Sequence, residues 1–203
     1  MSERISELRR LIEEFDLNKH PFYVAWREGT LPREKLAGYA HEWEGFVRRV
    51  GDAWDSLGMP HYGEEERRHY GLWMEFMREV SSNLGEPLGA TLNGTQVLES
   101  CAQLLFSQAP EAAGALYAFE YQQPATSEIK LQGLRQHYSV GERGQQYFVE
   151  HAGKWGEVDD LERYIEESQE EDFHRIRTGC ALMSAALWCA LDSIWFEGAP
   201  VRS

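Results

Sequence analysis

Apolar residues recur at helical spacing along most of the chain. Between residues 2 and 15, four of them fall on one face of a helix: Ile5, Leu8, Leu11 and Ile12. A repeat of three to four residues is typical of an amphipathic helix. No segment shows the two-residue alternation of a half-buried strand over a useful length. The pattern therefore predicts an all-α fold.

Prolines, glycines and capping residues divide this pattern into further helices. We predict them at residues 20–28, 30–57, 64–84, 95–108, 110–124, 125–138, 142–154 and 158–196, with a candidate break in the last one near His174. A link rich in glycine and proline occupies residues 85–94. Because no internal repeat or domain linker interrupts the chain, we expect residues 1–203 to form a single domain, a bundle of seven or eight helices.

Composition and charge limit the class of protein. The 203 residues are 42% hydrophobic and include seven tryptophans, which is enough for a sizeable core. A net charge of −14 argues against a nucleic-acid partner. The three cysteines form no CxxC pair, which fits a reducing, cytoplasmic location. The start of the chain resembles no signal peptide, and polar residues interrupt the longest apolar run, residues 180–196, so we also expect no membrane partner.

Glu120 stands out because apolar and aromatic residues surround it in the stretch ALYAFEYQQP, which begins at Ala115. A buried carboxylate is costly unless a partner compensates its charge. Glu120 is therefore a candidate metal ligand or acid–base group. The alternative is a solvated glutamate, or one that pairs with Lys130 ten residues later.

Several segments occur in an order that is characteristic of a known superfamily. They are HPFYVAWREGTL from His20, LAGYA from Leu36, HYGLWMEF from His69, the block from Glu120 to Tyr138, and YFVEH ending at His151. Together they resemble the haem-oxygenase-like superfamily of TenA and PqqC proteins. Within it, they are most similar to the branch of the chlamydial death-domain-associating protein and bacterial para-aminobenzoate synthases. The resemblance covers roughly residues 18–155. It implies a seven-helix bundle whose core holds two metal ions, iron or iron with manganese, that activate dioxygen.

The resemblance also implies a ligand set of two glutamates, one aspartate and three histidines. His69, Glu120 and His151 match three of these positions. Tyr62 stands where the other glutamate is expected, although three glutamates follow closely in the sequence: Glu64, Glu65 and Glu66.

Two further ligand positions differ after His151. Trp155 stands in place of the aspartate, and Asp159 in place of the last histidine. Asp159 can bind a metal, but Gly156 can end the preceding helix. In that alternative, Asp159 caps the next helix.

With Trp155 in place of an acid, a complete two-metal site is not expected. His69, Glu120 and His151 remain as the two-histidine, one-carboxylate set that binds a single Fe(II) ion in other folds. We therefore expect one ion, iron or alternatively manganese, with Asp159 as a further candidate ligand. The alternative is a satisfied polar network that binds no metal.

The resemblance gives three more residues a catalytic role. Tyr23 matches the tyrosine that the para-aminobenzoate-forming relatives consume as substrate, Lys130 matches their amine donor, and Tyr147 matches a tyrosine near their metals. Phe119 replaces another tyrosine of the family, so the set is incomplete. Packing of Tyr23 and pairing of Lys130 with Glu120 are the structural alternatives.

These observations favour an oxygen-dependent oxidoreductase that acts on a small molecule at a single-metal or remodelled site. Two alternatives keep the fold without the metal. One is a PqqC-like oxidase that needs no cofactor, and the other is a catalytically dead bundle that binds a small ligand or a partner protein. The amphipathic N-terminal helix would also suit a homodimer.

Overall fold

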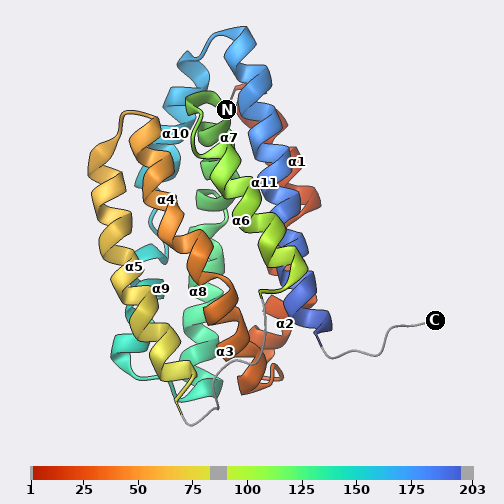
Figure 1. The fold of residues 1–203 in the computed structure, drawn as a ribbon, viewed down its shortest axis with the longest axis vertical. Coiled ribbons are helices and arrows are strands. Elements are labelled where there is room, and N and C mark those ends of the chain that lie inside the picture. Colours follow the sequence, from red (N-terminus) through yellow and green to blue (C-terminus); the bar gives the residue numbers. More distant parts are fainter. Residues whose placement is uncertain (1, 83–90, 198–203) are drawn as a thin grey trace, which may run out of the picture.

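The described part of the chain is helical throughout. A computed structural model describes residues 2–82 and 91–197, and every regular element within these ranges is a helix (Figure 1). The all-α prediction is therefore confirmed. Most of the link predicted at residues 85–94 lies outside the described residues.

The elements follow one another along the chain as the hydrophobic period predicts, with some shifted ends. They are α1 (Glu3–Glu14), η1 (Leu17–Lys19), α2 (Pro21–Glu28), α3 (Arg33–Glu42), α4 (Glu44–Ser56), α5 (Pro60–Val80), α6 (Asn93–Leu105), α7 (Ala109–Glu120), α8 (Gln123–Gly133), η2 (Leu134–Tyr138), α9 (Glu142–His151), α10 (Gly156–Glu167) and α11 (Glu170–Phe196).

Two of the predicted long helices are each divided in two. The helix predicted at residues 30–57 consists of α3 and α4, which meet at Trp43. The backbone of Trp43 stays in the right-handed helical region, so the apolar period continues across the joint and conceals it. The helix predicted at residues 158–196 consists of α10 and α11. Ser168 and Gln169 separate them with extended backbone, ahead of the break predicted near His174.

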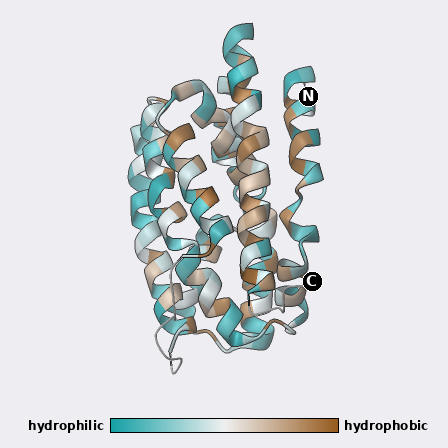
Figure 2. Cartoon of the chain, turned by 45° about the vertical axis from the view of Figure 1, so that its right-hand side comes forward, coloured by the Kyte–Doolittle hydropathy of each residue, from teal (hydrophilic) through white to brown (hydrophobic). Residues whose placement is uncertain are grey.

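The core lies between the apolar faces of these helices. Figure 2 shows hydrophilic and hydrophobic residues alternating along most helices, as amphipathic helices require. The closest packing joins α7 to α11, where a Cβ atom added to Gly114 would lie 1.8 Å from the Ile176 carbonyl oxygen. Glycine at this position therefore allows the two backbones to touch, which fixes α7 and the carboxylate at its end.

Helix α11 is long and apolar enough to cross a membrane by length and composition alone. However, 50% of its most apolar window is buried within the bundle. It packs along α7, α6 and α1 (Figure 1). These contacts support the prediction that residues 180–196 belong to a core helix.

Candidate metal centre

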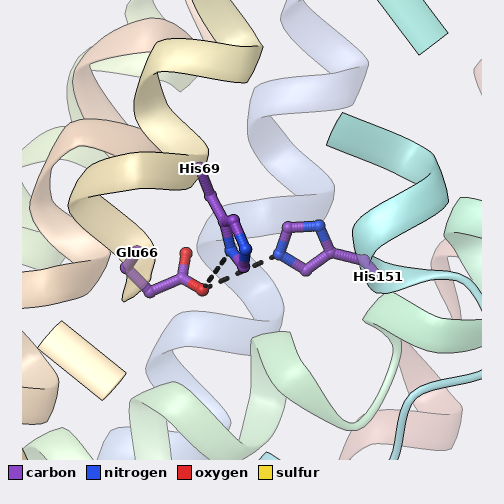
Figure 3. A group of neighbouring side chains, drawn as sticks. All are labelled: Glu66, His69 and His151. Carbon is purple, nitrogen blue, oxygen red and sulfur yellow. Dashed lines mark hydrogen bonds and ion pairs between the residues drawn. The ribbon is translucent and has the colours of Figure 1, made fainter. Parts of the chain in front are cut away.

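Helix α5 supplies two neighbouring side chains to the core. Glu66 and His69 are three residues apart, so they share one face of the helix, and both are buried. His69 Nδ1 donates a hydrogen bond of 2.9 Å to Glu66 Oε1. Figure 3 shows the His69 and His151 rings both facing the same oxygen of the Glu66 carboxylate.

His151 enters from the opposite side, as the last residue of α9. Its Nδ1 lies 2.7 Å from the Tyr147 carbonyl oxygen, which can only accept, so Nδ1 carries a proton. Its Nε2 then faces Glu66 Oε1 at 3.7 Å. A hydrogen bond that fixes one ring nitrogen and leaves the other facing a shared centre is the usual arrangement of a metal-binding histidine.

One ligand atom from each of Glu66, His69 and His151 lies within 4.8 Å of the others. Several buried atoms here lack a hydrogen-bond partner among the described residues: Glu66 Oε2, His151 Nε2 and Glu120 Oε1. Buried polar atoms are nearly always paired, so unpaired ones that gather in one place require an explanation. A carboxylate and two imidazoles are suitable ligands for iron or manganese. These residues therefore fit a divalent metal ion.

The electrostatics keep Glu66 ionised. Burial alone would raise its pKa, but interactions with His151 and His69 outweigh burial and lower the pKa of Glu66 to about 2. Burial likewise opposes the charged form of His151, yet Glu66 raises its pKa above the ordinary value. The centre thus presents a carboxylate at neutral pH, and metal binding would displace protons from the imidazoles.

Glu120 lies at the end of α7 and is 1% exposed, as its apolar surroundings predict. Burial and then the nearby carboxylates of Glu157 and Glu66 raise its pKa well above the ordinary value, and an interaction with Trp54 offsets part of this rise. The alternative, an ion pair between Glu120 and Lys130, is not found: no ion pair joins Lys130 to a carboxylate in the described part of the chain. We refer to Glu66, His69, His151 and Glu120 as the acidic centre.

The structure does not bring Asp159 to this centre. Helix α9 ends at His151, and Gly153 follows in the left-handed region with φ of +69°. Beyond this point, helical spacing no longer predicts which residues share a face. Trp155, which follows the break, is 45% exposed. Asp159 is exposed in the first turn of α10. The predicted cap at Asp159 is also wrong, because α10 begins three residues earlier, at Gly156.

Sequence reasoning did not single out Glu66, which was one of three adjacent candidates. Its signal is the spacing Glu-x-x-His, which places both side chains on one helical face and occurs in carboxylate-rich metal bundles. Tyr62, at the position expected for a glutamate, instead donates a hydrogen bond of 2.8 Å to Asp160 on α10.

A second polar group lies between α2, α3 and α8, and we call it the tyrosine–lysine cluster: Tyr23, Tyr39 and Lys130. Lys130 Nζ donates a hydrogen bond of 3.1 Å to the Tyr39 hydroxyl, which lies 3.1 Å from the Tyr23 hydroxyl. The same nitrogen lies 4.4 Å from the centroid of the Tyr23 ring. Burial lowers the pKa of Lys130 to about 7 and raises the pKa of Tyr23.

Tyr147 lies beside the acidic centre and links it to the other cluster. Its ring centroid is 4.4 Å from that of His151 and 4.9 Å from that of Trp73. Trp73 in turn contacts Tyr39, with centroids 5.7 Å apart. Gln123 donates a hydrogen bond of 3.0 Å to the Tyr147 hydroxyl, and burial followed by the charges of Glu66 and Glu120 raises the Tyr147 pKa. The two polar groups are thus joined by a continuous layer of aromatic rings.

Sequence comparisons find relatives with an enzymatic name. A 4-aminobenzoate synthase of Chlamydia pneumoniae is 26% identical over 171 residues, which cover 74% of this chain and 75% of that protein. A 4-aminobenzoate synthase of Nitrosomonas europaea is 27% identical and covers 91% of this chain and 87% of its own length. No protein-family profile matches the chain.

Solved structures share the fold at low sequence identity. A TenA homologue from Pseudomonas syringae covers 95% of this chain and 93% of its own, with a TM-score of 0.75 and 12% identity. A domain of unknown function with a haem-oxygenase-like fold, from Shewanella denitrificans, covers 98% of this chain and 95% of its own, with a TM-score of 0.72 and 13% identity. The fold is haem-oxygenase-like, and the sequence relatives match the para-aminobenzoate synthase branch that the motifs indicate.

Proposed function

We propose that the chain is an oxygen-dependent oxidase that acts on a small molecule at a metal site held by Glu66, His69 and His151. The observation that carries this proposal is the buried group of one carboxylate and two imidazoles with unpartnered ligand atoms. The fold and the relatives named 4-aminobenzoate synthase support an oxidase-type function. In this arrangement Glu66 takes the carboxylate position that the sequence assigns to Glu120.

Iron is the metal that we propose, with manganese as the alternative. When bound by two histidines and one carboxylate, either ion would supply redox chemistry with dioxygen at its open coordination positions. The protein contributes the fixed His151 tautomer, the ionised Glu66 and the burial of all three side chains.

We further propose that the product is 4-aminobenzoate, with Tyr23 as the source of the ring and Lys130 as the source of the amine. The family resemblance implies these roles, and the 4.4 Å between Lys130 Nζ and the Tyr23 ring centroid supports them. A Lys130 pKa of about 7 leaves much of the amine neutral at physiological pH, and only a neutral amine is nucleophilic. Tyr147 lies between the metal ligand His151 and this pair, where it positions the aromatic layer.

The test is single-turnover product formation. Protein loaded anaerobically with Fe(II) or Mn(II) is exposed to dioxygen with a reductant, and 4-aminobenzoate is measured by mass spectrometry. We expect at most one product per chain, because Tyr23 is consumed. His151→Ala should lose both metal and product, whereas Tyr23→Phe and Lys130→Arg should keep the metal and lose the product.

Tyr70→Phe is the matched control, because the Tyr70 hydroxyl bonds to Glu44 rather than to either cluster. Product from rigorously metal-free protein would instead favour the PqqC-like reaction without cofactor. Metal and product unchanged in His151→Ala would disprove the site.

Cytoplasmic location, a homodimeric state and the absence of nucleic-acid or membrane partners stay predictions.

A further inference from the structure

A surface cavity of about 230 Å³ lies between α4 and the end of α6. The two helices are side by side (Figure 1). The cavity is lined by charged, polar and apolar side chains: Arg49, Asp52, Ala102, Gln103, Phe106 and Ser107. None of these residues belongs to the acidic centre or to the tyrosine–lysine cluster. The cavity therefore shares no residue with the site described above.

Arg49 differs from the other partly buried arginines of the described chain. Arg4, Arg9 and Arg33 all bond to carboxylates or backbone carbonyls. Arg49 forms no hydrogen bond or ion pair with any described residue, and its Nε is buried without a partner. A guanidinium is always charged and can only donate hydrogen bonds. Because buried polar atoms are nearly always paired, the Arg49 side chain calls for an acceptor from a ligand.

Asp52 brings a negative charge to the same cavity. It follows Arg49 by three residues on α4, and it is exposed. Opposite charges at this spacing can pair along a helix. Here both side chains line the cavity, yet no ion pair joins them among the described residues. The cavity therefore offers a separate cation and a separate anion to whatever enters it.

The floor of the cavity is apolar. Phe106 is 4% exposed and Ala102 is fully buried. The Phe106 ring packs on the ring of Phe46, with centroids 6.0 Å apart, so its position is fixed from below. The cavity is smaller than a typical site for a drug-sized ligand. A matching ligand is thus a small molecule with an apolar body, such as one substituted ring, and two polar groups.

We propose that this cavity, which we call the Arg49 site, binds a small aromatic carboxylic acid that also carries an amine. Arg49 donates to the carboxylate with its forked N–H groups, and Asp52 accepts from the amine. Phe106 packs against the ring. Two sources share this chemistry: an aminobenzoate, which is the class of the product proposed above, and an aromatic α-amino acid. The site itself goes beyond the proposed function and does not depend on it.

The test is isothermal titration calorimetry of the full chain with 4-aminobenzoate and with phenylalanine. Either compound should bind at a single site per chain, and the tighter one identifies the source. Arg49→Gln should weaken this binding at least about tenfold, because a charge-assisted pair is lost. Arg49→Lys should recover part of the loss, since it keeps the charge without the fork. Arg48→Gln is the matched control, because the neighbouring Arg48 is exposed and lies 3.8 Å from Glu44; it should bind as wild type does.

Two simpler probes, benzoate and benzylamine, test the two charges separately. Benzoate lacks the amine and should bind about threefold more weakly than 4-aminobenzoate, as expected for an exposed partner. Asp52→Asn should remove this difference. Equal binding of the two acids to wild type would overturn the role of Asp52. Benzylamine binding more tightly than benzoate would overturn the assignment of the carboxylate to Arg49.

Two further outcomes would overturn the site itself. One is the absence of saturable binding of both 4-aminobenzoate and phenylalanine in the millimolar range. The other is equal affinity in wild type and Arg49→Gln, with circular dichroism showing that the variant is folded. Calorimetry measures neither metal content nor product, so either result would leave the proposed function standing.

Discussion

The bundle buries two polar groups of opposite charge, and they differ in how their atoms find partners. In the tyrosine–lysine cluster, one chain of hydrogen bonds joins the Lys130 amine to the hydroxyls of Tyr39 and Tyr23. In the acidic centre, oxygens of Glu66 and Glu120 have no partner among the described residues. The protein itself pairs the polar atoms of the first group, whereas the unpaired oxygens of the second group are those that support the proposed metal site.

This difference has energetic consequences. A buried network that is fully satisfied rigidifies a core, whereas one that is partly satisfied costs free energy until a ligand completes it. We therefore expect substitutions in the tyrosine–lysine cluster to change stability with or without metal. Substitutions in the acidic centre should have effects that depend on whether metal is bound.

Glu66→Ala should have the largest effect. It leaves two buried histidines without their shared carboxylate, and breaking such a pair costs about 3 kcal/mol of unfolding free energy. Urea unfolding of metal-free protein measures the loss. Glu65→Ala is the control, because Glu65 is only partly buried and its carboxylate makes a longer contact with the same histidine, 3.8 Å from His69 Nε2. Equal losses in both variants would mean that Glu66 does not organise the centre.

Tyr39→Phe should have the next largest effect. It removes the hydroxyl between Lys130 and Tyr23, and leaving buried polar groups unpaired costs about 2 kcal/mol. The loss should be the same in metal-free and metal-loaded protein, as measured by urea unfolding. Tyr62→Phe, whose hydroxyl bonds to Asp160 near the surface, should cost clearly less. A loss confined to metal-loaded protein would contradict the view that this cluster is satisfied by its own atoms.

Lys130→Met should change the pH dependence of stability. The native pKa of Lys130 is about 7, below the ordinary value of 10.5. Between these values the unfolded chain binds a proton that the native state does not, so the unfolding free energy rises with pH. The slope is on the order of 1 kcal/mol per pH unit. Lys130→Met should remove this contribution, whereas Lys154→Met, at an exposed ion pair, should keep it. Identical pH profiles for wild type and Lys130→Met would show that the amine titrates normally.

Glu120→Gln should have the smallest effect and the opposite sign. In metal-free protein it removes a buried acid that has no ion-pair partner, so stability should be unchanged or gain up to about 1 kcal/mol. In metal-loaded protein the same substitution removes a carboxylate of the acidic centre that would balance the charge of the ion, so it should lower the melting temperature. Thermal unfolding with and without Mn(II) compares the two states. A loss of stability in both states would place Glu120 among residues satisfied by the protein.

The sequence predicts the fold better than it predicts the site, and the reason is periodicity. Within a helix, spacing determines which residues share a face, so the burial of Glu120 and the positions of His69 and His151 follow from pattern and resemblance. Spacing loses this meaning where a helix ends. Trp155 and Asp159 follow the end of α9, so they do not lie beside His151 as a continuous helix would have placed them. Glu157 lines a pocket beside His69 because of the path that the chain takes after Gly153, which no local pattern encodes.

His69 and His151 differ in how firmly their backbones are held. His69 lies well inside a helix of 21 residues, whereas His151 is the last residue of α9. Helix ends open locally at far lower free energy than the whole protein unfolds. Opening one turn would break the hydrogen bond from the Ala152 amide to the Phe148 carbonyl and withdraw His151 from Glu66. An ion bound there could thus be exchanged while the bundle stays folded, at a rate that amide hydrogen exchange at Ala152 would report.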